Sequence, residues 1–286
     1  MSPATVAIVL IAAVAHAVWN LASTFKRGDT VVFVAAYTAL SALLCLPFAI
    51  GGQMTGTQPL TASLIMASAV SALLHVSYSL TLQAGYVRAD LGVVYPIARG
   101  LGPLLTMAFA VILLAERPSP VAAVGAMVVL AGVALVTGNP FRGTGSRARQ
   151  GLTWGALTGA TIAGYTIWDA YAVVHLELAP VSYYAGTLLV QALLLGPSVM
   201  RRRAALWASV RGDALPILVV AVLSPVAYIL VLVAMQSSPV TLVAPLRETS
   251  IVIGSLLAWR LFHDGQLARR LSGALLVLVG IAAVSV

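Results

Sequence analysis

The sequence predicts an all-α integral membrane protein: ten transmembrane helices arranged as two inverted five-helix repeats around a central cavity. Three observations predict it, namely the composition, the spacing of the apolar segments and a duplicated pattern. Of the 286 residues, 60% are hydrophobic and 8% are charged. A soluble domain carries about a quarter charged residues, so a protein this poor in charge needs lipid around it.

Ten apolar segments are long enough to cross a bilayer, which takes about 20 residues. We expect helices near residues 3–24, 30–50, 60–85, 90–114, 119–138, 151–175, 180–199, 214–236, 240–261 and 267–285. Only residues 139–150 and 200–213 form sizeable linkers, which leaves no room for a soluble domain. The predicted units are a first repeat over 1–138, a cytoplasmic linker over 139–150 and a second repeat over 151–286.

The basic residues of the loops predict the orientation. Thirteen fall on one side of the predicted membrane and Arg117 alone on the other. The thirteen are Lys26, Arg27, Arg88, Arg142, Arg147, Arg149, Arg201, Arg202, Arg203, Arg211, Arg260, Arg269 and Arg270. The positive-inside rule places these loops in the cytoplasm and both termini in the periplasm, in a bacterial inner membrane. The net charge of +8 is therefore an orientation signal, and we expect no nucleic-acid partner.

An internal repeat relates the two halves. The run AHAVWN in the first predicted helix matches GYTIWD in the sixth at an offset of 149 residues. The same offset carries Pro96 and Arg99 onto Pro245 and Glu248. Because each repeat has an odd number of helices, the second copy must enter the membrane from the opposite face. Inverted repeats of this kind are typical of secondary transporters, which bind substrate near the bilayer midplane.

These features resemble the drug/metabolite transporter superfamily, in its ten-helix EamA-type branch. The resemblance rests on the run from His16 to Asn20, the proline-centred helices, the acidic Glu116 and Asp264, and a Gly-x6-Gly pattern in the fifth and tenth helices. Within the superfamily the chain looks most like the YddG-type exporters of aromatic and other amino acids. The resemblance implies a basket of helices around a cavity, helices five and ten set to one side, and alternating access without ATP.

Ionisable side chains at membrane depth usually face a cavity or a partner. Arg99 lies about halfway along the fourth predicted helix, and Glu248 occupies the equivalent position in the second repeat. An ion pair of Glu248 with Arg99 or Arg247 either locks the repeats together or leaves an arginine to attract a substrate carboxylate. Pro96 and Pro245 each remove a backbone hydrogen bond, which either shapes the cavity wall or provides a hinge.

Aromatic and further polar side chains complete the predicted substrate-binding set. Rings with a polar edge suit an aromatic or thioether substrate, although Trp and Tyr also gather at membrane interfaces. The remaining members are His16, Trp19, Asn20, His75, Tyr78, Tyr95, Tyr165, Trp168, Asp169 and Tyr228. If transport is proton-coupled, His16, Asp169 and Glu248 are the candidates; the alternative for His16 is a hydrogen-bonded core residue.

The leading functional prediction is a secondary transporter that exports amino acids, aromatic and other neutral ones, or related metabolites. The alternatives are a multidrug or lipid-linked-sugar carrier on the same fold and, less favoured, a membrane enzyme acting on lipid. We expect no cofactor and no metal, since no Walker motif occurs and the four His and single Cys45 lack ligand spacing. The expected partners are the substrate and membrane lipid. The glycines of helices five and ten predict close packing, either within one chain or across a homodimer.

Overall fold

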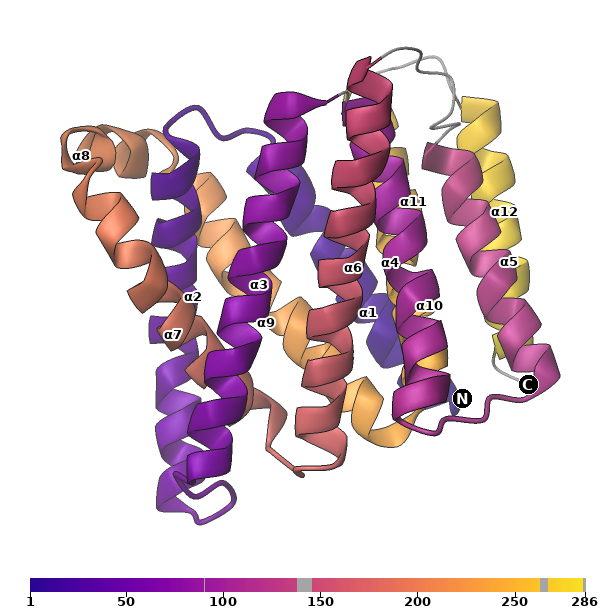
Figure 1. Cartoon of the computed structure of the whole chain (residues 1–286), viewed down its shortest axis with the longest axis horizontal. Coiled ribbons are helices and arrows are strands. Elements are labelled where there is room, and N and C mark those ends of the chain that lie inside the picture. Colours follow the sequence, from indigo (N-terminus) through magenta and orange to yellow (C-terminus); the bar gives the residue numbers. More distant parts are fainter. Residues whose placement is uncertain (90, 138–145, 263–266, 285–286) are drawn as a thin grey trace.

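The computed structural model describes residues 1–89, 91–137, 146–262 and 267–284, and every regular element in them is a helix (Figure 1). The elements are α1 (Pro3–Ser23), α2 (Thr30–Met54), α3 (Ala62–Arg88), α4 (Leu91–Leu113), α5 (Pro120–Thr137), α6 (Ser146–Val174), α7 (Pro180–Met200), α8 (Arg203–Gly212), α9 (Ala214–Ser237), α10 (Val240–Arg247), α11 (Thr249–Phe262) and α12 (Leu267–Val284). The predicted all-α class is confirmed.

The described helices include spans for seven of the ten predicted membrane crossings. In the described residues seven spans are both long and apolar enough to cross: Pro3–Ser23, Thr30–Met54, Ala62–Arg88, Val93–Leu113, Pro180–Met200, Ala214–Ser237 and Val240–Leu257. The described apolar parts of α5 and α12 are shorter, and α6, with 29 residues, is long but more polar. The chain is therefore a multi-pass membrane protein.

The helix predicted over 240–261 is broken, which corrects the sequence-based expectation. α10 ends at Arg247 and α11 begins at Thr249, with Glu248 between them. The Glu248 N–H donates to the carbonyl of Pro245 at 3.0 Å, and the Ile251 N–H donates to the carbonyl of Glu248 at 2.9 Å. Both bonds span three residues instead of four. Pro245 already lacks an N–H donor, so the helix tightens here and turns Glu248 into the protein.

The linker predicted over 200–213 also differs, because it contains α8. Beside this helix, the Asp213 carboxylate accepts the N–H groups of Arg27 and Gly28 at 2.8 and 2.9 Å, and Ser209 Oγ accepts the N–H of Asp29 at 3.1 Å. These bonds fasten the α1–α2 turn of the first half to the α8–α9 segment of the second. α8 lies at the edge of the molecule opposite the two termini (Figure 1).

A second carboxylate joins the halves on the terminus side. Glu116, in the α4–α5 connection, accepts the N–H groups of Val240 and Thr241 at 2.6 and 2.8 Å. It thereby caps the first turn of α10, whose N–H groups have no partner within the helix. Its predicted counterpart, Asp264, lies outside the described residues.

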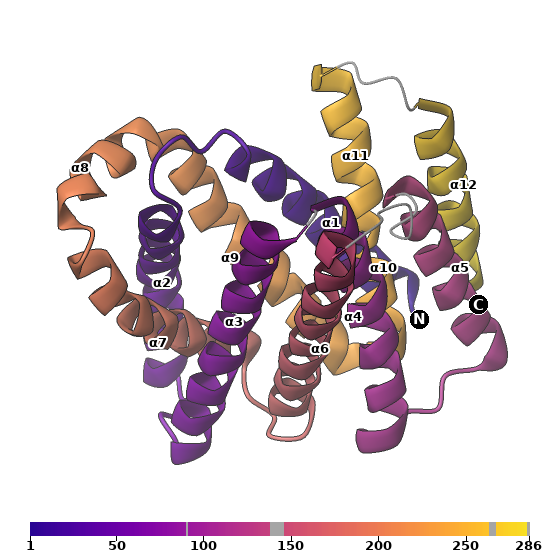
Figure 2. The same cartoon turned by 45° about the horizontal axis from the view of Figure 1, so that its top comes forward.

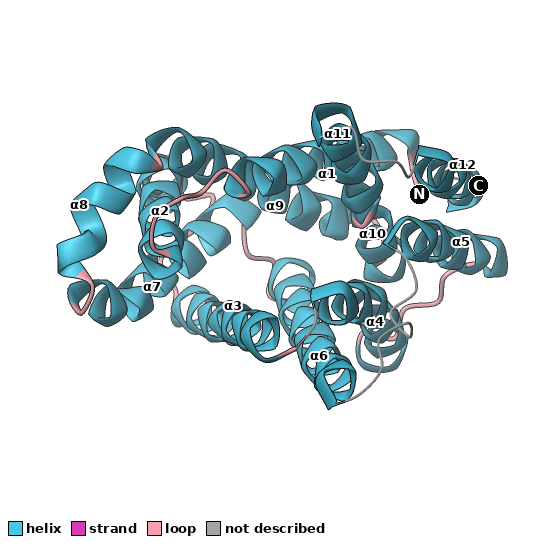
Figure 3. Cartoon of the chain, turned by 90° about the horizontal axis from the view of Figure 1, so that it is seen from above, coloured by secondary structure: helices cyan, strands magenta, loops and turns pink. Residues whose placement is uncertain are grey.

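Two layers of helices face each other across the molecule (Figure 3). In one, α3 and α4 pack against α6; in the other, α9, α10 and α11 pack against α1. At the repeat offset, α1 corresponds to α6, α3 to α9, and α4 to α10 with α11. Each layer therefore combines helices from both halves. α2 packs on α7 at one end, and α5 packs on α12 at the other (Figures 1 and 2).

The paired glycines bring the backbones of α5 and α12 together. A Cβ at Gly132 would lie 2.7 Å from the carbonyl oxygen of Gly273, and one at Gly280 would lie 2.7 Å from the carbonyl oxygen of Gly125. No side chain fits at such distances, so only glycine permits this contact. The pattern therefore packs two helices within one chain, and the homodimer stays a prediction.

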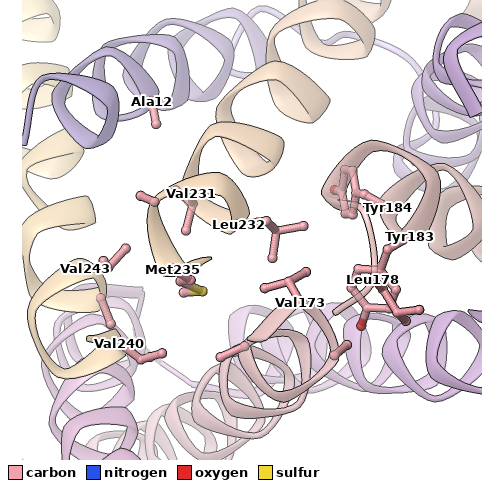
Figure 4. Packing of buried hydrophobic residues seen from close by; sticks show 14 of the residues in the cluster. Ala12, Val173, Leu178, Tyr183, Tyr184, Val231, Leu232, Met235, Val240 and Val243 are labelled. Carbon is pink, nitrogen blue, oxygen red and sulfur yellow. The ribbon is translucent and has the colours of Figure 1, made fainter. Parts of the chain in front are cut away.

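Buried apolar side chains from both layers pack together near the beginning of α1, on the side of the molecule where the N-terminus lies, and Figure 4 shows part of this cluster. They come from α1, from the ends of α6 and α9, and from the beginnings of α7 and α10. The labelled members are Ala12, Val173, Leu178, Tyr183, Tyr184, Val231, Leu232, Met235, Val240 and Val243. We call this the terminus-side cluster. Close packing of this kind leaves no path for water, so the cluster closes that side of the molecule.

Candidate functional site

A cavity of about 120 Å³ lies between the two layers, next to the terminus-side cluster. Eight of the predicted substrate-binding residues line it: His16, Trp19, His75, Tyr78, Arg99, Tyr165, Tyr228 and Arg247. They come from α1, α3, α4, α6, α9 and α10. Residues up to 231 positions apart in the sequence thus meet at one hollow.

The lining repeats at the offset found in the sequence. Four pairs of lining residues are separated by 149 positions: His16 and Tyr165, His75 and Ser224, Tyr78 and Ala227, and Ser79 and Tyr228. The two halves therefore present equivalent positions to the cavity, but the side chains at those positions differ. The repeat preserves the shape of the site and varies its chemistry.

Two arginines at the cavity share one carboxylate. Arg99 Nη1 lies 3.4 Å from Glu248 Oε2, and Arg247 Nη2 lies 3.3 Å from Glu248 Oε1. Glu248 is 1% exposed and is not a lining residue. The guanidinium of Arg99 also lies 5.6 Å from the ring centre of Tyr95, in cation–π range. The break between α10 and α11 aims Glu248 at both arginines, and Glu248 alone balances only one of their two positive charges.

A second buried carboxylate, Asp169 on α6, collects four donors. Its Oδ1 accepts the hydroxyls of Ser71 and Tyr183 at 2.7 and 2.6 Å. Its Oδ2 accepts the hydroxyl of Tyr228 and lies 3.1 Å from His75 Nε2. The donors come from α3, α7 and α9, so four helices meet at this carboxylate. Its roughly four acceptor positions are all used.

Aromatic rings form one wall of the cavity. The His75 ring stacks on Tyr165 with centroids 4.2 Å apart, and Tyr78 meets Tyr165 edge-on at 5.6 Å. Tyr184 and Tyr228 lie 4.8 Å apart beside them. The result is a broad apolar surface with polar edges, the kind that accepts a flat apolar group.

Two polar atoms at the cavity have no partner in the described part of the chain. They are His16 Nε2 and Trp19 Nε1, both buried, and both residues line the cavity. An unsatisfied buried polar group costs about 1–3 kcal/mol. A water or a polar ligand group in the cavity would remove that cost.

Five of the predicted residues are absent from the cavity lining. Asp169 and Glu248 bind side chains that line the cavity without lining it themselves, and Tyr95 lies against Arg99. The amide of Asn20 donates instead to the carbonyl of His16, one turn earlier in α1. The indole N–H of Trp168 donates to the carbonyl of Ala67 at 3.0 Å. The polar groups of Asn20 and Trp168 thus bond to the backbone, and a role for these two residues in substrate binding stays a prediction.

The two prolines behave differently. α4 continues through Pro96, whose side chain lies outside the described residues. Pro245 is buried within α10 and precedes the break at Glu248. Only the second proline is followed by an interrupted helix, although sequence alone made them equivalent.

Sequence reasoning missed part of the site. Further lining residues include Tyr37, Thr38, Ser41, Tyr184, Gln191 and Ser224, while Ser71 and Tyr183 bind Asp169. Hydroxyl residues within membrane helices often bond to their own backbone, so they gave no distinctive signal. Tyr183 and Tyr184 lie near the start of α7, where interfacial placement is the usual interpretation. In the described residues no three His, Cys, Asp or Glu side chains gather as metal ligands.

Comparison with protein families gives a match for the second half of the chain. Residues 149–286 match the EamA-like transporter family. The chain contains an EamA-like transporter domain. This domain comprises α6 to α12 and supplies Asp169, Arg247 and Glu248.

A comparison with solved structures covers the whole chain. A solved structure described only as the crystal structure of a protein matches with a TM-score of 0.78 over 99% of this chain and 96% of that one. At 18% identity this match shows the fold alone. No curated protein matches the chain. EamA-like proteins are transporters rather than enzymes, which indicates a membrane transporter of small molecules.

Proposed function

We propose that the protein is a secondary transporter that exports amino acids, aromatic and other neutral ones, by alternating access. The observation that carries this proposal is the pair of cavity-lining arginines that share the single carboxylate of Glu248. Membrane interiors penalise an unbalanced charge. A substrate carboxylate beside Arg99 and Arg247 would supply the missing negative charge.

The surroundings of the arginines support a carboxylate with an apolar body. The unpartnered Nε2 of His16 and Nε1 of Trp19 give polar contacts in the same cavity. Across it, the rings of His75, Tyr165 and Tyr228 provide the flat apolar surface that an aromatic or thioether side chain would cover. A purely cationic drug would meet the unbalanced arginine charge instead, which disfavours the multidrug alternative.

Glu116 and His175 are near the ends of the predicted helices, where an enzyme acting on lipid would have its site, and both have other partners. Glu116 caps α10 through two N–H groups. His175 stacks on Tyr171 with centroids 5.2 Å apart. Neither adjoins a nucleophile in these contacts, which favours transport over lipid chemistry.

Alternating access fits the uneven closure of the two sides. The terminus-side cluster closes one side by apolar packing, whereas Thr38, Gln191 and Ser224 add polar groups to the cavity. We place the basic loops and α8 in the cytoplasm of a bacterial cell, with the termini in the periplasm. In an export cycle, opening of the terminus-side cluster would release substrate to the periplasm.

Counterflow in proteoliposomes tests the proposal. Vesicles loaded with unlabelled phenylalanine should take up labelled phenylalanine, and external methionine and threonine should compete. Arg99→Gln should lower the uptake by about tenfold or more, the effect of losing some 1.4 kcal/mol of binding. His175→Gln, away from the cavity, is the matched control. Absence of counterflow in the wild type, or unchanged counterflow in Arg99→Gln, would contradict the proposal.

A further inference from the structure

His75 connects the cavity with the buried Asp169. Its Nε2 lies 3.1 Å from Asp169 Oδ2, and its side chain is 13% exposed whereas that of Asp169 is wholly buried. His75 is also a lining residue, and Asp169 is not. Of the donors to Asp169, only His75 and Tyr228 line the cavity, so the cavity reaches this carboxylate through the imidazole ring or through the Tyr228 hydroxyl.

Among the four donors to Asp169, His75 alone can gain a proton. Ser71, Tyr183 and Tyr228 donate neutral hydroxyls. An imidazole keeps one N–H on its partner and takes a second proton at the other nitrogen. His75 Nδ1 makes no hydrogen bond to a described residue, and its ring faces the cavity.

We propose that His75 and Asp169 form a proton-binding site that couples substrate export to proton entry, which deepens the proposed function and rests on it. A proton from cavity water binds His75 Nδ1, while Nε2–H stays on Asp169. The pair changes from a net charge of −1 to 0. When the cavity opens to the other side, Nδ1 returns the proton to water.

The groups around His75 leave it as the group whose protonation changes. Tyr165 from α6 stacks on its ring, Tyr228 from α9 meets it edge-on at 5.3 Å, and Tyr184 from α7 lies 6.4 Å away. These are neutral phenols. The cations of the same cavity, Arg99 from α4 and Arg247 from α10, are held by Glu248.

The proton and the ammonium group of the substrate exclude each other at this site. With His75 neutral, the pair is anionic and the tyrosine faces attract an ammonium group. With His75 protonated, the pair is neutral overall and the imidazolium repels that group. One proton therefore enters for each zwitterion that leaves, and one positive charge moves inward per cycle.

This exchange sets a ratio that can be measured. At zero membrane potential, a pH difference of one unit should sustain a substrate gradient of up to about tenfold. The ratio is a thermodynamic endpoint, so a variant that is merely slow still reaches it. Loss of coupling removes this gradient at any remaining rate of exchange.

The experiment compares the wild type with His75→Gln and His175→Gln in potential-clamped proteoliposomes. Glutamine can donate to Asp169 but cannot take up a proton. We expect pH-driven accumulation of labelled phenylalanine in the wild type and in His175→Gln. In His75→Gln, we expect weaker counterflow, because the variant also changes the cavity lining, and no pH-driven accumulation at the endpoint. Equal accumulation in His75→Gln would overturn the proton site. Wild-type counterflow without pH-driven accumulation would also overturn the proton site, but it would agree with the proposed function.

A second measurement needs no variant. Lowering the pH should raise the wild-type half-saturation concentration for phenylalanine, because protons compete with its ammonium group. Phenylpropionate, which has the same ring and carboxylate but no ammonium group, should inhibit counterflow equally well across that range. The same pH dependence for both compounds would overturn the competition.

Discussion

Asp169 and Glu248 are two buried carboxylates of one repeat, and they are stabilised in different ways. Asp169 binds three hydroxyls and an imidazole, whereas Glu248 binds two guanidinium groups. The equivalent positions of the first repeat hold Asn20 and Arg99. Gene duplication can thus copy a shape while the charges diverge, which leaves one side of the cavity richer in cations and the other richer in aromatic rings and hydroxyls.

The partners of the two carboxylates also differ in how a ligand can reach them. Both arginines of Glu248 line the cavity, but only His75 and Tyr228 do so among the donors to Asp169. A dissolved anion can therefore substitute for Glu248 more easily than for Asp169.

The largest effect on stability should come from Asp169→Ala. It leaves four buried donors without their acceptor, and removing one partner of a buried polar pair costs about 3–5 kcal/mol. Denaturant unfolding in detergent micelles would measure the loss. A decrease below about 1 kcal/mol, the size of one ordinary hydrogen bond, would show that Asp169 is not the junction of four helices.

Glu248→Ala should lose less stability than Asp169→Ala when an anion is added to the solution. The unpaired Arg99 and Arg247 face the cavity, so acetate at high concentration can bind between them. Thermal unfolding with and without acetate should show partial recovery, and the same acetate should leave Asp169→Ala unchanged. Equal recovery in both variants would remove the distinction between the two sites.

The smallest effect should come from removing single hydroxyls. Tyr183→Phe and Tyr228→Phe each delete one donor to a charged acceptor, worth about 1.5–3 kcal/mol. Tyr228 lines the cavity and Tyr183 does not. We therefore expect both to lower stability, but only Tyr228→Phe to change the half-saturation concentration for counterflow. A change in both would place Tyr183 within reach of substrate.

The helices and the repeat could be predicted because both depend on local pattern. Apolar length marks a membrane helix, and the matching runs around Trp19 and Trp168 give the offset that the cavity lining reproduces. α8 was missed because its ten residues are too few and too polar for that signal. The break at Glu248 was missed because Pro96 and Pro245 occupy equivalent positions in the repeat. Nothing in the sequence shows that α4 continues past its proline while the equivalent helix breaks.

By itself, the sequence determined that the chain lies in lipid as a set of membrane-crossing helices, and that Arg99, Arg247 and Glu248 had to find partners there. Only the tertiary structure decided that two arginines share Glu248, that four donors meet at Asp169, and that His75 stands between that carboxylate and the cavity. The physical reason is that membrane insertion depends on the hydrophobicity of each segment, whereas a hydrogen-bonded site depends on which helix faces meet. Those faces come from opposite halves of the chain, so their pairing is a property of the packed bundle.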